Sequence, residues 1–239
     1  MEEQRASRRR RTVAVLAAAL LPLAAVGCVV LVSERPLLML GTAAGREQRG
    51  AVAIRDNVTA FQKWGTRAFT VPYLARHYGC SGYFTQEGGD DQKEQFLDCL
   101  GRCLTECEAV DLFLLAHSNS YIAWVEELDP SLTRRLRLVY NTGCGDASQA
   151  PRWLGVGADA YIGHPGRSES PVFYVYFLRR WTAGWSVEAA ASEANRLARR
   201  NFQSAQWLTG GKVRADVLWR RSGALCFGRT DITIRDPGQ

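Results

Sequence analysis

Short apolar runs alternate with amphipathic stretches along most of this chain. The runs that predict strands are Arg35–Gly41, Cys80–Phe84, Asp111–Ala116, Leu136–Asn141, Gly157–Gly163 and, at a sheet edge, Ala224–Ile234. The stretches that predict helices are Val52–Phe69, which Pro72 is expected to end, Asp91–Glu108, Ile122–Leu128, Val172–Trp181 and Ser186–Arg200. Strands that alternate with helices predict an α/β fold, here a three-layer α/β/α sandwich around a mostly parallel sheet.

The N-terminal segment has the pattern of a membrane signal. Residues 13–32 form an uncharged apolar run of 20 residues, about the length that spans a bilayer, and Arg8 to Arg11 directly precede it. Because positive charge stays on the cytoplasmic side, we expect everything after residue 33 to lie outside the membrane. The predicted organisation is a basic cytoplasmic N-terminus at 1–12, a transmembrane anchor or lipoprotein signal at 13–32, and one domain at 35–239.

Three fates of this segment agree with the sequence. An uncleaved anchor is favoured by the apolar continuation through Val29–Val32. The stretch Ala24–Cys28 resembles a bacterial lipobox, in which Cys28 would carry the lipid. Cleavage and secretion is the third outcome. The first two outcomes make the membrane a partner of the chain.

The net charge does not indicate a nucleic-acid partner. The chain carries a formal charge of +6, but residues 1–12 hold five Arg against two Glu, so only +3 remains for the other residues. A charge this small is not the footprint of a nucleic-acid-binding domain.

Two predicted strands end in reactive side chains. Asp111–Ala116 is followed by His117, and Leu136–Asn141 is followed by Thr142, Gly143 and Cys144. Residues just past the carboxyl ends of neighbouring parallel strands meet in one crevice, so the imidazole and the thiol can lie together although 27 positions separate them. A thiol beside an imidazole is the arrangement of a cysteine nucleophile and its base.

The order of motifs resembles the caspase-like cysteine peptidases, a superfamily that includes gingipains, clostripain, metacaspases and separase-like CHAT domains. The similarity rests on Leu-Leu-Ala-His117 after one strand, Asn-Thr-Gly-Cys144-Gly after the next, Gly-Ala-Asp-Ala-Tyr-Ile-Gly163, and a closing helix pair joined at Gly184-Trp-Ser-Val. It spans roughly residues 35 to 200.

The resemblance implies a peptidase that acts on a protein or peptide substrate and needs neither cofactor nor metal. His117 matches the catalytic histidine and Cys144 the nucleophile, with an oxyanion pocket formed around Ser118, Gly143 and Gly145. Ser118 departs from the family pattern, which usually has glycine directly after the histidine. A serine still supplies a backbone N–H to such a pocket.

Two other functions fit the same residues. One is a non-catalytic binding scaffold with the caspase-like fold. The other is an α/β serine hydrolase, in which Ser118 is the nucleophile and Asp146 and His164 follow in the order Ser, Asp, His. The simpler expectation for Asp146 is a solvated cap for the next helix.

Three cysteines recur at helical spacing. Cys99, Cys103 and Cys107 share one face of the Asp91–Glu108 helix, and a zinc site would need a fourth ligand and usually tighter spacing, so we expect a core face. Export permits disulfides, and Cys80 is a candidate to pair with one of these three or with Cys226.

Overall fold

One mixed β-sheet organises the chain in the computed structural model, which describes residues 45–56, 60–86, 91–115, 117, 119–167 and 171–238. Its strands follow the order β2-β1-β3-β4-β5-β6; the first five are parallel and β6 is antiparallel to β5. Their bounds are β1 Arg49–Arg55, β2 Cys80–Thr85, β3 Ala109–Leu115, β4 Leu136–Asn141, β5 Ala160–Gly163 and β6 Leu225–Gly228. The predicted α/β class with a mostly parallel sheet is confirmed.

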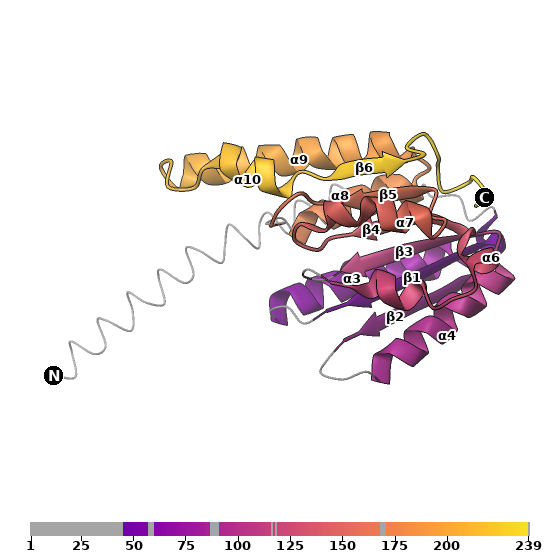
Figure 1. Cartoon of the computed structure of the whole chain (residues 1–239). Helices are drawn as coiled ribbons and strands as arrows, with labels where there is room; N and C mark the ends of the chain where they lie inside the picture. Colours follow the sequence, from indigo (N-terminus) through magenta and orange to yellow (C-terminus); the bar gives the residue numbers. More distant parts are fainter. Residues whose placement is uncertain are drawn as a thin grey trace, which may run out of the picture. The chain divides into compact units, whose positions relative to one another are not determined.

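Eight α-helices and two 3-10 turns connect these strands in the described part of the chain (Figure 1). The helices are α3 Ala60–His77, α4 Asp91–Glu106, α5 Tyr121–Val125, α6 Pro130–Thr133, α7 Ala150–Gly155, α8 Pro171–Thr182, α9 Val187–Leu208 and α10 Ala215–Ser222. The 3-10 turns are η1 Arg46–Gln48 and η2 Asp146–Gln149.

Helices pack on both faces of the sheet. On one face, Phe96 and Leu100 of α4 belong to the same buried cluster as Val52 of β1 and Leu112 of β3. On the other face, the rings of α8 reach β3 and β4, and Phe177 lies 5.0 Å from Tyr140 between ring centroids. Burial on both faces explains why the central strands are continuous apolar runs rather than alternating ones.

The N-terminal part of this sheet differs from the prediction. Val52–Phe69 was expected to be one helix, but the segment contains the end of the interior strand β1 and the first part of α3. β1 is buried along its whole length between β2 and β3. Its small residues fit that crowded position, so tertiary burial overrides the helical spacing that the sequence shows.

Pro72 also lies inside α3 instead of ending it. A proline removes one helix hydrogen bond, but Tyr73 and Leu74 directly after it are buried at 3% and 2% exposure. Their burial favours continuing the helix.

The other predicted elements are present with shifted ends, and α9 continues eight residues beyond Arg200. The prediction missed the short helices α6 and α7, and also α10, which lies in a stretch that reads as a glycine-rich tail. The predicted strand Arg35–Gly41, the apolar run 13–32 with Cys28, and the basic residues 1–12 lie outside the described residues. Within the described ranges, no helix combines the length and apolarity needed to cross a bilayer.

A buried ion pair holds the centre of the sheet to α8 and to the C-terminal tail. Arg137 of β4 donates from Nε and Nη2 to the two carboxylate oxygens of Asp111 in β3, both at 2.9 Å. Tyr78 and Trp181 donate to the same carboxylate at 2.6 and 2.8 Å. Arg137 Nη1 donates to the backbone oxygens of Ile234 and Asp236. Four donors compensate the cost of burying this carboxylate.

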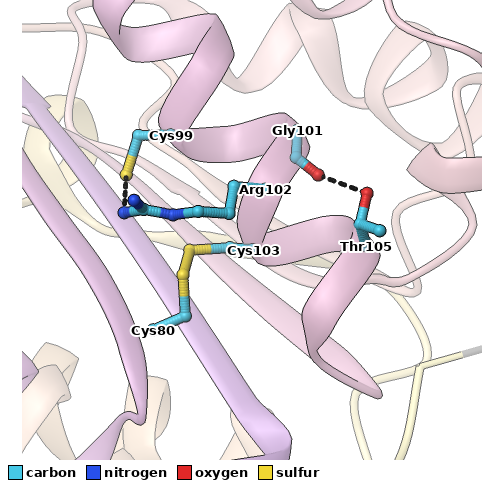
Figure 2. The surroundings of a disulfide bond; sticks show 6 residues. All are labelled: Cys80, Cys99, Gly101, Arg102, Cys103 and Thr105. Carbon is cyan, nitrogen blue, oxygen red and sulfur yellow. Dashed lines mark hydrogen bonds between the residues drawn. A yellow bond between two sulfur atoms is a disulfide. The ribbon is translucent and has the colours of Figure 1, made fainter.

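A disulfide joins the edge strand β2 to α4 (Figure 2). It links Cys80 to Cys103, whose Cα atoms are 5.6 Å apart. Cys99 of α4 and Cys107 directly after α4 are buried thiols in the same core cluster as Cys103, which confirms the core-face interpretation. The predicted pairing of Cys80 with one cysteine of this helix is confirmed, and Cys226 is not its partner.

Candidate active site

The two predicted site loops leave adjacent strands at the same sheet edge. β3 and β4 are hydrogen-bonded in parallel, with Leu114 opposite Asn141 near their carboxyl ends. His117 follows β3 and Cys144 follows β4. Thr142 donates from its backbone N to Leu114 O at 2.9 Å, so the pairing continues into the loop that carries the cysteine. The predicted neighbourhood of the two strand ends is thus present.

The loops contact each other at Gly143. A Cβ atom on this glycine would lie 2.7 Å from the carbonyl oxygen of His117 and would overlap the carboxylate of Asp146. The backbone on the amino side of Cys144 therefore lies directly against the backbone of His117. Only glycine permits this approach.

A polar network of four side chains connects the two loops. Asn119 donates from Nδ2 to His117 O at 3.0 Å, to Asn141 Oδ1 at 3.0 Å and to Asp146 Oδ2 at 2.9 Å. Its backbone N also donates to Asp146 Oδ2, and its carbonyl accepts from Gln149 Nε2 at 2.6 Å. Asn119, Asn141 and Gln149 were not among the site residues predicted from the sequence. The sequence feature that could have indicated this network is a polar residue at or just after the end of each buried strand.

Asp146 is not the solvated cap that the sequence suggested. Asp146 is only 5% exposed, and no side-chain capping hydrogen bond forms at the start of η2. Burial raises the pKa of Asp146 to about 6, although hydrogen bonds from Asn119, Asn141 and Gln149 oppose the increase. The carboxyl is a buried anchor of the two loops, within the network instead of at the surface.

The predicted nucleophile and base are both reachable from solvent. His117 is exposed, and Cys144 is half-buried and is not part of a disulfide. The other described thiols, Cys99, Cys107 and Cys226, all have pKa values raised by burial, that of Cys226 to about 12. A thiol with a raised pKa is a poor nucleophile at neutral pH.

Two of the three backbone N–H groups that the sequence predicts as oxyanion donors already form hydrogen bonds within the protein. Gly143 N donates to Asn141 Oδ1 at 2.9 Å, and Gly145 N donates to Gly166 O at 3.1 Å. Gly145 adopts φ +79°, which its lack of a Cβ permits. Neither N–H is directed to a substrate oxygen in this conformation. Ser118, the third expected donor, lies outside the described residues.

His164 does not have the environment of a hydrolase base. It is fully buried; its Nδ1 lies 2.8 Å from Ser222 O, and its Nε2 lies 3.5 Å from Tyr140 Oη. In a serine hydrolase, the carboxylate orients the imidazole through Nδ1. Here a backbone oxygen occupies that position, and burial lowers the pKa of His164 to about 4. This geometry does not support the arrangement of Ser118, Asp146 and His164.

Among residues 45–238 that the structure describes, no group of three or more His, Cys, Asp or Glu side chains has the geometry of a metal site.

No protein-family model matches this chain, and no curated protein sequence is significantly similar to it.

Proposed function

We propose that this chain is a cysteine peptidase of the caspase-like type that hydrolyses peptide bonds with a dyad of His117 and Cys144. The observation that carries the proposal is the contact between the two loops at Gly143, which brings the backbone of His117 to the residue before the thiol. The strand order that places β3 beside β4, and helices on both faces of the sheet, agree with the three-layer sandwich of that superfamily.

The proposed reaction has two steps. The sulfur of Cys144 attacks the scissile carbonyl carbon, and the thiol proton passes to His117. His117 then protonates the leaving amine as the C–N bond breaks, which leaves a thioester on Cys144. Water hydrolyses the thioester, so the acid is released and the thiol is restored. Stabilisation of the oxyanion is assigned to the backbone N–H of Ser118, because the N–H groups of Asn119, Gly143 and Gly145 are bonded within the protein.

Selective alkylation tests the dyad. Cys144 should react with iodoacetamide near neutral pH much faster than a simple thiol, and His117→Ala should remove the advantage while the circular dichroism spectrum stays unchanged. Cys226→Ser is the matched control, because this thiol is also half-buried but has a raised pKa. A peptide library then tests hydrolysis, which Cys144→Ala should abolish. Equal alkylation rates in the parent and His117→Ala would contradict the dyad.

A non-catalytic binding scaffold is the second candidate. It is favoured by the two occupied N–H groups, since a preformed oxyanion pocket needs donors directed at the reacting oxygen. The scaffold predicts an intact fold, slow alkylation of Cys144 and no hydrolysis of any peptide, so the same experiments separate the two candidates.

We propose that the domain acts on the outer side of the cytoplasmic membrane, tethered by residues 13–32 or by lipid on Cys28. The proposal is supported by the four Arg before the apolar run and by the Cys80–Cys103 disulfide, which an oxidising compartment preserves. Protease added to intact spheroplasts should digest the domain. Protection until the membrane is lysed would contradict this location.

A further inference from the structure

The last two helices concentrate the positive charge of the chain. From Arg196 to Ser222, the second half of α9, the connecting loop and α10 carry seven Lys or Arg and one acidic residue, Asp216, whereas the first half of α9 holds Glu188 and Glu193. We call this segment the α9–α10 hairpin. Its net charge of +6 equals that of the whole chain, so all other residues together sum to zero. These cations are exposed, but Arg214 and Arg220 are paired with Asp216, and Arg196 is paired with Glu193.

The free end of this hairpin is apolar as well as basic. Trp207 and Leu208, adjacent at the end of α9, are 81% and 71% exposed, more than any other large hydrophobic residue in the described ranges. Gly210 and Gly211 then reverse the chain with positive φ angles, and the exposed Lys212 follows. An exposed tryptophan beside a leucine and several cations is the composition of a membrane-interface segment.

A groove runs along the hairpin next to this tip. Two hollows of about 510 and 640 Å³ share Arg199 and Gln203, and they are bounded by Trp207 on one side and Trp219 on the other. The guanidinium of Arg199 lies 5.9 Å from the ring centroid of Trp219. A guanidinium held in an open groove can pair with a phosphate by two parallel hydrogen bonds.

The base of the hairpin contacts the loop that borders the candidate nucleophile. Gly166 N donates to Arg221 O, Ser222 Oγ donates to Arg167 O, and Gly166 O accepts from Gly145 N. Figure 1 shows the free end of the hairpin projecting on the side where the parallel strands end. The tip and the edge that carries Cys144 therefore belong to the same end of the domain.

We propose that the α9–α10 hairpin docks on the surface of an anionic lipid membrane. Trp207 and Leu208 enter the headgroup boundary, while the exposed Arg199, Arg200 and Lys212 pair with lipid phosphates. Each basic residue near such a surface contributes roughly a fivefold gain in affinity, and an exposed apolar tip requires burial somewhere. The sequence independently directs this chain to a membrane through residues 13–32. Docking turns the edge with Cys144 towards the lipid surface. The proposal does not depend on Cys144 being catalytic.

The experiment uses the full chain reconstituted in vesicles, so that the N-terminal segment is present throughout. Brominated phosphatidylcholine quenches tryptophan at the headgroup boundary, and the difference between the parent and Trp207→Phe reports this one residue. We expect Trp207 to be quenched in vesicles of phosphatidylcholine with a minority of phosphatidylglycerol and not in phosphatidylcholine alone. Lys212→Glu with Arg200→Glu should abolish the quenching.

A matched charge-reversal variant serves as the control, and a single-stranded oligonucleotide serves as the alternative ligand. Arg67→Glu with Arg134→Glu reverses two exposed charges away from the hairpin and should leave the quenching unchanged. Equal quenching in neutral and anionic vesicles, or none in either, would overturn the proposal. Stronger protection of residues 205–214 from hydrogen exchange by a single-stranded oligonucleotide than by anionic vesicles would also overturn it, in favour of nucleic acid. Circular dichroism confirms that each variant is folded.

Discussion

Asn119 donates to one carboxylate oxygen of Asp146 twice, from its side chain at 2.9 Å and from its backbone N at 3.3 Å. These bonds join the turn after β3 to the turn after β4, which are 27 residues apart in sequence. The position of His117 relative to Cys144 therefore depends on side chains that are not themselves part of the proposed dyad.

Asn119→Ala should loosen this connection. It removes three donations from Nδ2 and leaves the buried carboxylate with fewer donors, which costs about 1–3 kcal/mol of unfolding free energy. Alkylation of Cys144 should slow as well, because His117 is no longer held in place. Asn201→Ala, which removes a bond to Tyr176 on α8, is the control and should leave alkylation unchanged. Reduced stability with an unchanged alkylation rate would show that the network is only structural.

Three glycine-to-alanine substitutions should change the unfolding free energy by different amounts, because the space around each glycine differs. Gly143→Ala places a methyl group into the Asp146 carboxylate and should cost more than about 2 kcal/mol. Gly145→Ala meets open space at φ +79° and should cost about 1 kcal/mol from backbone strain alone. Gly101→Ala, in the middle of α4 with nothing within 4 Å, should stabilise by about 0.5–1 kcal/mol. Urea denaturation measures all three, and a different order would contradict the loop contact.

Asp146 should make stability fall as pH rises. Burial raises its pKa from 3.8 to about 6, so the folded protein binds this proton more tightly than the unfolded chain. The resulting stabilisation is complete below about pH 4 and is lost as pH rises through about 6. Asp146→Asn cannot titrate, so its stability relative to the parent should increase between pH 4 and 7. Guanidinium melts across this window provide the comparison; a constant difference would contradict the raised pKa.

The Asp111–Arg137 pair should be costly to break. Asp111→Ala leaves the fully buried guanidinium of Arg137 without its carboxylate and should lower the unfolding free energy by about 3–5 kcal/mol. Glu126→Ala breaks the exposed pair with Arg152 and should cost at most about 1 kcal/mol. Denaturant midpoints measure the difference. Similar small effects of the two substitutions would mean that the buried pair is not needed for stability.

The disulfide should account for a measurable part of the stability. Cys103→Ser opens a loop of 23 residues to Cys80 and should cost about 2–4 kcal/mol. Reductant should lower the Tm of the parent and leave that of Cys103→Ser unchanged. Cys226→Ser, which alters a cysteine outside any disulfide, should keep the full response to reductant. A parent Tm insensitive to reductant would contradict the assigned pairing.

The sequence alone determined the features that depend on neighbouring residues. Apolar runs such as Leu136–Asn141, and helical faces such as that of Cys99 and Cys103, are recognised from residues close together in the chain. The same holds for the placement of His117 and Cys144 after strands. The α/β class followed from their alternation.

Features that depend on residues far apart in the chain became clear from the three-dimensional fold. Strand pairing and loop contacts determine the interior position of β1 between β2 and β3, and the choice of Cys103 as the partner of Cys80. They also bury Asp146 and bond the backbone N–H groups of Gly143 and Gly145 within the protein. The physical reason is that strand order and loop contacts are set by burial of the whole sheet, whereas periodicity reports only the faces of each element.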